Sequence, residues 1–365
     1  MTITQFISEF QSSIPLAQAE DFDNVGLLCG DPSREITGIL VCHDALEKIV
    51  EEAIKLGHNL IVCFHPILFK GIKSLTGKNY VERALLKAIE NKIAIFAVHT
   101  ALDNDYLGVN YRICNALGLK EQKVLDPKKE DLYELSFQVP SEHRQKVLDA
   151  VFTAGAGSIG YYDRCSFSLE GEGQFRPRPG ADPFLGDLGE LEKVSEHRVA
   201  VILERYKKGR VISALLEAHP YEEVAYQMTP IVNENQYLGL GRYGELERPM
   251  ESREFLEFVK ETFDVPVIRH SSLIGRPIRK VGVLGGSGAQ YIPLALSKGI
   301  DAFITGDVKY HDFFQGENRM VILDIGHYES EQFVVGQLFD LLSEKFPKFA
   351  ISKSRENTNP VNYFQ

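Results

Sequence analysis

The order of apolar and polar positions predicts alternating strands and helices in the first third of the chain. Residues 36–42, 59–63 and 93–98 are apolar runs of the length expected for buried strands. Residues 45–56 repeat apolar side chains at helical spacing, and Gly57 follows them as the kind of residue that commonly ends a helix. Helices are also predicted at residues 81–90 and near residues 109–117. These repeated β–α–β units predict an α/β domain whose mainly parallel sheet carries helices on both faces.

The last third repeats this alternation, whereas the middle third does not. The last third is predicted to contain strands at residues 278–284, 301–304 and 320–325, and a long closing helix at residues 329–345. In the middle, two β–α–β patterns flank a Gly- and Pro-rich stretch at residues 170–190, which predicts a ferredoxin-like α+β insert. We therefore expect a discontinuous domain of residues 1–127 and 234–365, interrupted by an insert domain at residues 128–233.

Length, charge and cysteine usage narrow the class of protein. A chain of 365 residues is long enough for two domains. Its net charge of -11 argues against extended binding to nucleic acid, but a small phosphorylated ligand needs only local positive charge or a metal. The five cysteines are widely spaced without a Cys-x-x-Cys pair, which is typical of a reducing cytoplasm. No apolar run approaches the ~20 residues that span a bilayer, so we expect a cytoplasmic protein without a membrane segment.

Four short segments carry side chains that divalent metals prefer. They are Cys63-Phe64-His65-Pro66, His99-Thr100-Ala101-Leu102-Asp103, Thr305-Gly306-Asp307 continuing to His311, and the segment from Gly326-His327 to Glu331. Three of the four directly follow predicted strands. In an open α/β sheet, ligands bind in the crevice beyond the carboxyl ends of the strands. Imidazole and carboxylate groups gathered there predict a hydrolytic metal site.

Each of these segments also has an ordinary structural explanation. Taken alone, His65 is typical of a loop-capping histidine, and the i, i+4 pair His99 and Asp103 could be a structural hydrogen bond. Acids such as Glu331 are common in the first turn of a helix because the helix macrodipole favours them. The position of all three segments at strand ends favours one shared metal site over three unrelated features.

The turn Gly285-Gly286-Ser287-Gly288-Ala289 has three interpretations. It fails as a dinucleotide fingerprint, since Tyr291 occupies the third glycine position. It matches a nucleophile elbow, and Asp307 and His327 follow Ser287 in the order of α/β-hydrolases, so a serine hydrolase is a minor alternative. The more common interpretation is a tight strand-to-helix turn whose amides face an anionic ligand. His219-Pro220-Tyr221-Glu222-Glu223, in the insert, is expected to form a turn with satisfied side chains.

Several ordered motifs together resemble one family. They are Asp23-Asn24-Val25-Gly26-Leu27, His65-Pro66 with Phe69 and Gly71, His99-Thr100-x-x-Asp103 with Gly108-Val109-Asn110, Thr305-Gly306-Asp307 with His311, and Gly326-His327-x-x-x-Glu331. They resemble the GTP cyclohydrolase I type 2 homologue family, also called the Nif-three-like family. The middle resembles the PII- or CutA-like insert of its longer bacterial members, through Ala154-Gly155-Ala156-Gly157-x-Ile159-Gly160, Cys165-Ser166-Phe167 and the segment from His219 to Tyr226.

The resemblance implies a two-metal site and toroidal homohexamers built as trimers of dimers. Carried over motif by motif, the metal ligands are His65, Asp103, His327 and Glu331, and Glu331 bridges the ions. The family usually has a second histidine immediately before the one that matches His65, and this chain has Phe64 there. We therefore expect one of the two ions to lack a protein ligand, so that one or two ions of the zinc, iron or manganese type are bound per chain.

The implied chemistry is a metal-dependent ring-opening hydrolysis of a nucleotide, as in a GTP cyclohydrolase. His99 and His311 are the candidate catalytic residues, because histidine transfers protons near neutral pH. Alternatively, these two histidines orient the metal ligands by hydrogen bonds. A competing function is a non-catalytic protein that senses a metal or ligand and forms a ring-shaped oligomer.

Overall fold

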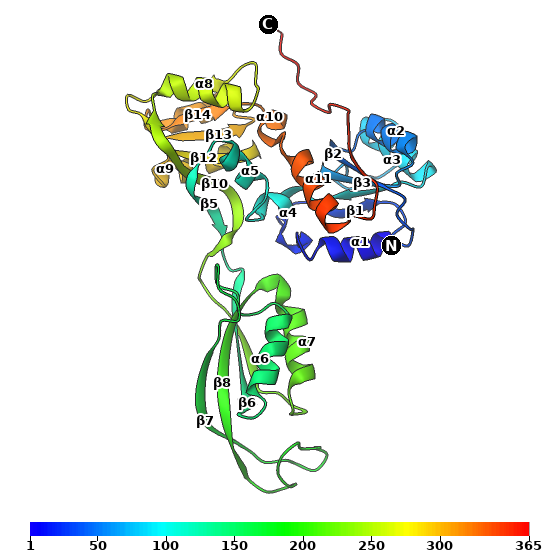
Figure 1. Ribbon diagram of the computed structural model, residues 1–365, viewed down its shortest axis with the longest axis vertical. Helices are drawn as coiled ribbons and strands as arrows, with labels where there is room; N and C mark the ends of the chain where they lie inside the picture. Colours follow the sequence, from blue (N-terminus) through cyan, green and yellow to red (C-terminus); the bar gives the residue numbers. More distant parts are fainter. Residues whose placement is uncertain (365) are drawn as a thin grey trace. The chain divides into compact units, whose positions relative to one another are not determined.

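The computed structural model describes residues 1–364 and contains two compact units (Figure 1). The outer unit joins Met1–Asp126 to the chain that follows from Leu238, and the insert unit is Pro127–Tyr237. All five cysteines are free thiols. Among the described residues, no helix has both the length and the apolar character needed to cross a membrane.

The outer unit contains two β-sheets. The first sheet has the order β1-β4-β3-β2-β15, and its strands are β1 (Gly26–Cys29), β4 (Ala94–Ala97), β3 (Leu60–His65), β2 (Ile39–Asp44) and β15 (Ile351–Lys353). Its pairs are parallel except for β1 against β4. The second sheet has the order β11-β14-β13-β12-β10-β5, with strands β11 (Arg269–His270), β14 (Val321–Asp324), β13 (Ala302–Gly306), β12 (Ile278–Ser287), β10 (Asn235–Met250) and β5 (Lys120–Lys128).

The prediction of a single mainly parallel sheet in this unit was therefore wrong. Local alternation correctly indicated parallel neighbours, since β2, β3 and β4 pair in parallel and so do β12, β13 and β14. It could not show that the second group of strands starts a new sheet instead of extending the first. Nor could it show that β15 belongs to the first sheet. After the second sheet the chain returns, and its last strand pairs with β2.

Helices cover both faces of the first sheet, and one core continues into the second sheet. Alternate residues of β2 point to opposite faces, as a strand requires: Leu40 packs with α2 (Glu47–Leu56) and α3 (Tyr80–Glu90), whereas Val41 packs with α1 (Ile3–Phe10) and α11 (Val334–Lys345). The core on the second face also contains apolar residues of β12, β13, β14 and α8 (Ser252–Thr262). The remaining helices of this unit are α4 (His99–Asn104), α5 (Val109–Ala116), α9 (Ile292–Ser297) and α10 (His327–Glu331), with 3-10 turns at η1 (Leu16–Gln18), η3 (Ala289–Tyr291) and η4 (Tyr310–Gly316).

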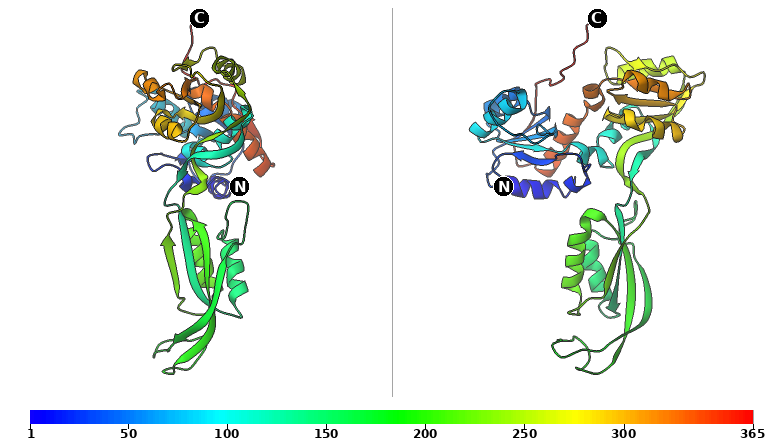
Figure 2. Two further views of the ribbon diagram at one scale, coloured as in Figure 1. Left: turned by 90° about the vertical axis from the view of Figure 1, so that its left-hand side faces the viewer. Right: turned by 180° about the vertical axis from the view of Figure 1, so that it is seen from behind.

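The insert unit is a four-stranded antiparallel sheet with two helices on one face (Figure 2). Its elements are β6 (Leu132–Pro140), α6 (Arg144–Thr153), β7 (Phe167–Phe175), β8 (Glu192–Glu204), η2 (Arg205–Lys207), α7 (Lys208–Ala218) and β9 (Tyr226–Pro230). The order β7-β8-β6-β9 is that of a ferredoxin-like βαββαβ unit. β7 extends into the Gly-rich stretch that carried little strand signal, because continuous backbone pairing with the long β8 satisfies its hydrogen bonds.

Candidate metal centre

Three imidazoles converge on one buried carboxylate in the outer unit. Glu331 lies on α10, His327 begins the same helix, and His43 and His65 lie at the ends of β2 and β3. The Oε2 atom of Glu331 is 3.0 Å from Nε2 of His43, 3.3 Å from Nε2 of His65 and 3.4 Å from Nε2 of His327. The structure thus brings together His65, His327 and Glu331, three of the four ligands that the resemblance implied.

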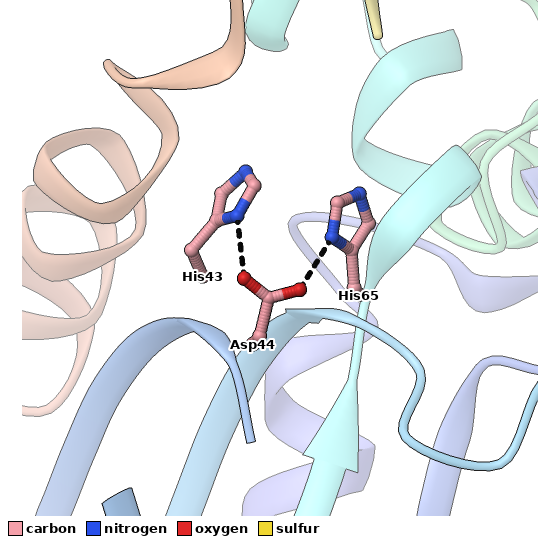
Figure 3. Close-up of side chains that lie close together, drawn as sticks. All are labelled: His43, Asp44 and His65. Atoms are coloured by element: carbon pink, nitrogen blue, oxygen red, sulfur yellow. Dashed lines mark hydrogen bonds and ion pairs between the residues drawn. The ribbon is translucent and has the colours of Figure 1, made fainter. Parts of the chain in front are cut away.

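A carboxylate holds the other ring nitrogen of each imidazole. Asp44 lies between two of them: its Oδ2 is 3.0 Å from Nδ1 of His43 and its Oδ1 is 2.9 Å from Nδ1 of His65 (Figure 3). Asp307 Oδ2 is 2.7 Å from Nδ1 of His327. Histidines that bind metals usually donate their second ring nitrogen to a carboxylate, which fixes the tautomer and the orientation of the ring. This pattern leaves the three Nε2 atoms available for a metal ion.

The charges of the cluster favour a cation. Burial would lower the pKa of His65, but hydrogen bonds with Asp44 and Glu331 raise it to about 10. Burial would raise the pKa of Glu331, but its bonds with His43 and His65 lower it to about 2. For His327, the lowering effect of burial is outweighed by Asp307 and Glu331, so its pKa is raised. The carboxylates therefore stabilise positive charge on and beside these imidazoles.

Asp103 provides an independent sign of a cation. It lies on α4, and its Oδ1 atom is enclosed by protein but has no hydrogen-bond partner within residues 1–364. Burial raises its pKa well above the usual value, and Glu331 raises it further, whereas His65 lowers it. A buried carboxylate oxygen without a partner is costly, and in native proteins it usually has a reason. The donors present, three imidazoles and two carboxylates, fit a divalent metal of the transition series.

The two predicted catalytic histidines have different positions. His99 does not bond Asp103; its Nδ1 is 2.8 Å from Oδ1 of Asp23, and its ring centroid lies 5.2 Å from that of His65. Burial would raise the pKa of Asp23, but hydrogen bonds with His99 and Thr100 lower it to about 2. His311 instead lies exposed on η4, edge-on to Tyr310. His311 is therefore not part of this cluster, because the segment turns away after Asp307, and its catalytic role stays a prediction.

Sequence reasoning missed His43 and Asp44, although a signal for them was present. The segment Cys42-His43-Asp44 ends a buried strand next to β3, much as three of the four identified segments directly follow predicted strands. The predicted strand stopped at residue 42, so the two polar residues were assigned to a connecting loop. Asp307 was recognised as part of a segment but not as the partner of His327.

The glycine turn after β12 supports the site without facing an anion. The Gly285 amide donates to Oδ1 of Asn110, and the Gly286 amide donates to Oγ of Ser330, so neither is directed at a ligand, contrary to our expectation. Gly286 has φ +69, and a Cβ atom there would lie 2.3 Å from Oε1 of Glu331. Glycine is therefore required for the backbone to pass beside the carboxylate.

The geometry gives no support to a serine hydrolase. Asp307 and His327 do pair, but Nε2 of His327 faces Glu331 and His65. That nitrogen would have to accept the proton of the Ser287 hydroxyl, as in a catalytic triad.

A cavity of about 550 Å³ opens beside the cluster. His43, Asp44, His65, Asp307 and His327 contribute to its wall, together with aromatic, acidic and basic residues that include Tyr328, Arg269, Glu329 and Tyr363. Arg269 pairs with Asp324 at 2.9 Å and still has a largely exposed side chain. The cavity has the size of a typical small-molecule site.

The insert unit has its own cavity of about 610 Å³, lined by β7, the following loop and the segment after α7. Arg176 and Arg198 lie in its wall among several glutamates. The predicted turn at His219 has satisfied side-chain atoms, because Nε2 is 2.8 Å from the carbonyl oxygen of Gln138 and Nδ1 accepts from the Tyr221 amide at 3.1 Å.

Comparison with known proteins identifies the family. The model of the Duf34/NIF3 (NGG1p interacting factor 3) family matches residues 1–360. The chain belongs to the Duf34/NIF3 family. Relatives of this Duf34/NIF3 chain include proteins named GTP cyclohydrolase 1 type 2 homolog: one from Halalkalibacterium halodurans is 39% identical over 98% of this chain and 97% of the relative, and one from Bacillus subtilis is 37% identical over 98% of each. Among solved structures, a Bacillus cereus protein related to NIF3 matches with a TM-score of 0.87 and 36% identity, covering 100% of this chain and 99% of that one.

Proposed function

We propose that the outer unit binds one or two divalent cations and uses them to hydrolyse a nucleotide. The observation that carries this proposal is the convergence of three carboxylate-oriented imidazoles on Glu331. Asp103 lies nearby, and its Oδ1 atom has no hydrogen-bond partner among the described residues. His65, Asp103, His327 and Glu331 would hold the metal. Such mixed imidazole and carboxylate sets suit zinc, iron or manganese.

When bound, a divalent cation would act as a Lewis acid toward the substrate and would lower the pKa of a water molecule. The reaction class is ring-opening hydrolysis, in which water adds to the imidazole carbon of the base, one ring C–N bond breaks, and the leaving nitrogen takes a proton. His99 is the residue to move that proton, since Asp23 holds its Nδ1 and leaves the other nitrogen to exchange a proton. The names of the relatives, GTP cyclohydrolase 1 type 2 homolog, agree with this class of substrate.

The cavity beside the cluster is suited to such a ligand. Arg269 offers a guanidinium group for phosphate oxygens, and Tyr328 and Tyr363 offer aromatic rings for a base. Most of the other charged groups in the wall are carboxylates, so a polyanionic nucleotide would bind well only once a metal had balanced them.

The second candidate function is metal or ligand sensing without turnover. It is favoured by the insert, whose βαββαβ order is compatible with a PII-like module and which has a cavity of its own. For either function we infer, from the resemblance, a cytoplasmic homohexamer built as a trimer of dimers; light scattering of the purified chain tests its size.

Turnover measurements separate the two functions. The metal-loaded chain is incubated with GTP and other nucleotides, and products are compared with those of Glu331→Ala and of the control His58→Gln. His58 is also buried, but its Nε2 contacts Oγ of Ser352 at 3.1 Å, away from the cluster. A metal-dependent product that Glu331→Ala abolishes and His58→Gln retains supports the hydrolase. Metal binding without any product favours the sensor, and absence of metal binding refutes both.

A further inference from the structure

We propose that the cavity of the insert unit binds a small organic cation, in which an ammonium or guanidinium group is attached to an apolar or aromatic body. This cavity of about 610 Å³ is lined by β7, the loop that follows it, β8 and the segment after α7. It has the size of a typical small-molecule site. The inference goes beyond the proposed hydrolysis and does not rest on it, because all the residues that carry it lie in the insert unit.

A shielded carboxylate lies in the wall of this cavity. Glu196, on β8, is only 8% exposed. Its Oε1 atom accepts a hydrogen bond from the hydroxyl of Tyr221 at 2.9 Å, whereas its Oε2 atom has no hydrogen-bond or ion-pair partner among the described residues. Burial raises the pKa of Tyr221, and the bond to Glu196 raises it further, so the phenol keeps the proton that it donates. Since an ionised carboxylate only accepts hydrogen bonds, Oε2 remains available to a donor or a cation that enters the cavity.

The neighbouring strand makes room for this carboxylate. Gly173 of β7 lies in the wall of the same cavity, and a Cβ atom there would be 2.0 Å from Oε2 of Glu196. Any larger residue would displace the carboxylate from its place in the wall. Glycine inside a strand often marks a point where a ligand or another part of the chain approaches closely.

A cluster of three aromatic rings includes the hydrogen-bond partner of this carboxylate. Phe175 ends β7, Phe184 lies in the following loop, and Tyr221 follows α7. The ring centroids of Phe175 and Phe184 lie 5.7 and 6.4 Å from that of Tyr221. The loop is fastened to the segment after α7, because the amide of Asp182 donates to Oε1 of Glu222 at 3.0 Å. Aromatic faces attract ammonium and guanidinium groups, so the rings and the carboxylate favour the same kind of ligand.

The charges of the wall favour a cation over an anion. Five glutamates line the cavity against two arginines, Arg176 and Arg198, and both arginine side chains are exposed. This excess of carboxylates would repel a nucleotide or another polyanion. A bare metal ion is also poorly suited, because the groups of three possible metal ligands among the described residues all lie in the outer unit. An organic cation uses both the carboxylate and the apolar part of the wall, which includes Leu169 and Leu185.

The test uses the full chain, with phenethylamine as the probe and 3-phenylpropionate as its anionic counterpart. Both compounds carry a phenyl ring on the same two-carbon linker. Ligand-observed NMR titration measures their dissociation constants for the wild type, Glu196→Gln and the control Glu172→Gln. Glu172 lies in the same wall, but its carboxylate is exposed and pairs with Lys193 at 2.7 Å.

The wild type should bind phenethylamine at least about 10-fold more tightly than 3-phenylpropionate, and Glu196→Gln should lose at least about 10-fold in affinity for the amine. Glu172→Gln should differ from the wild type by less than about 2-fold, because exposed charges contribute little. Glutamine retains an oxygen that accepts from Tyr221, so a purely structural role of Glu196 would leave amine binding unchanged. Absence of amine binding, equal or tighter binding of the anion, or equal effects of the two substitutions would overturn the inference.

Phe184→Leu covers the case in which Glu196→Gln does not fold. Phe184 is 50% exposed in a loop, so its replacement leaves the core of the insert intact. Leucine keeps the wall apolar but removes the aromatic face, so affinity for the amine should fall about 2- to 5-fold, and affinity for the anion should change less. An unchanged affinity for the amine would overturn the inference. Metal binding and nucleotide turnover are measured separately, so failure here leaves the proposed function intact.

Discussion

Asp103→Asn provides a sharp test of the metal centre, because it should change stability in opposite directions with and without metal. Without metal, the wild-type carboxylate has an Oδ1 atom that lacks a hydrogen-bond partner within residues 1–364, and it is repelled by Glu331 and Asp23. Asparagine has the same shape, removes that repulsion and can donate to neighbouring carboxylates. Leaving a buried polar group unsatisfied costs about 1–3 kcal/mol, and more for a charged one. We expect a gain in the free energy of unfolding of at least that order.

The pH dependence of this gain follows from the raised pKa of Asp103. A carboxyl with a raised pKa in the folded state favours folding below its unfolded pKa of about 4, and that contribution is lost as the pH rises through the folded pKa. The advantage of Asp103→Asn should therefore be small near pH 4 and grow toward alkaline pH. At about 2–4 °C per kcal/mol for a unit of this size, the melting temperature in chelator should rise by several degrees.

With added metal, the wild type should become more stable than Asp103→Asn. At a free concentration 100 times its dissociation constant, a bound ion stabilises the folded wild type by about 2.7 kcal/mol, and Asp103→Asn should lose most of that gain. Thermal unfolding with chelator and with zinc measures both effects. Asp105→Asn is a matched control, because burial raises the pKa of Asp105 too, but the Leu107 amide and Arg242 lower it. A variant less stable than wild type in chelator at pH 8, or one that retains the full zinc-induced shift, would refute the reasoning.

Three further substitutions test other parts of the structure. Gly286→Ala should cost about 1–2 kcal/mol through its positive φ and also weaken zinc binding by displacing Glu331, whereas Gly299→Ala, with φ +67 and no atom within 4 Å, should leave zinc affinity unchanged. Phe64→His should raise the number of tightly held ions, measured by elemental analysis after dialysis, from fewer than two per chain; two tight ions in the wild type would contradict the argument from Phe64. Because burial lowers the pKa of His219, its stabilising contribution is lost as the pH falls below about 6.5, so urea unfolding of His219→Gln should depend less on pH between 7 and 5 than that of the wild type. An equal dependence in the two chains would contradict this.

The sequence was sufficient to predict that the histidines that follow strands lie together. His65 and His327 were found because each follows an apolar run, and the carboxyl ends of parallel strands gather polar groups at one edge. The same rule would have found His43 if the strand had been extended by two residues. His311 lies outside the cluster for a different reason: a residue four positions beyond Asp307 reaches the cluster only if the chain continues helically there. Instead Asp307 has a left-handed φ of 56°, which redirects the backbone.

The division of the outer unit into two sheets is not available from the pattern of apolar residues. Alternating β–α–β units specify local pairing, but the choice between extending a sheet and starting another depends on contacts between residues more than 200 positions apart. The extent of β7 could not be predicted from the sequence either. Glycines and acids have little strand propensity, and the strand is held by backbone hydrogen bonds to β8.

The two sheets also explain why the site depends on tertiary folding. The first sheet supplies His43, Asp44 and His65, whereas the second sheet and its connections supply Asp307 and α10 with Glu331. Neither set alone brings three imidazoles to one carboxylate, so binding of an ion would stabilise the packing of one sheet against the other, as metal binding commonly couples to folding. The insert interrupts this arrangement at little cost, because β5, which leads into it, and β10, which leads out, are adjacent strands of the second sheet. Because these two strands are neighbours, the point where the chain leaves the outer unit lies beside the point where it returns. The insert can therefore have any length without moving the residues of the metal centre.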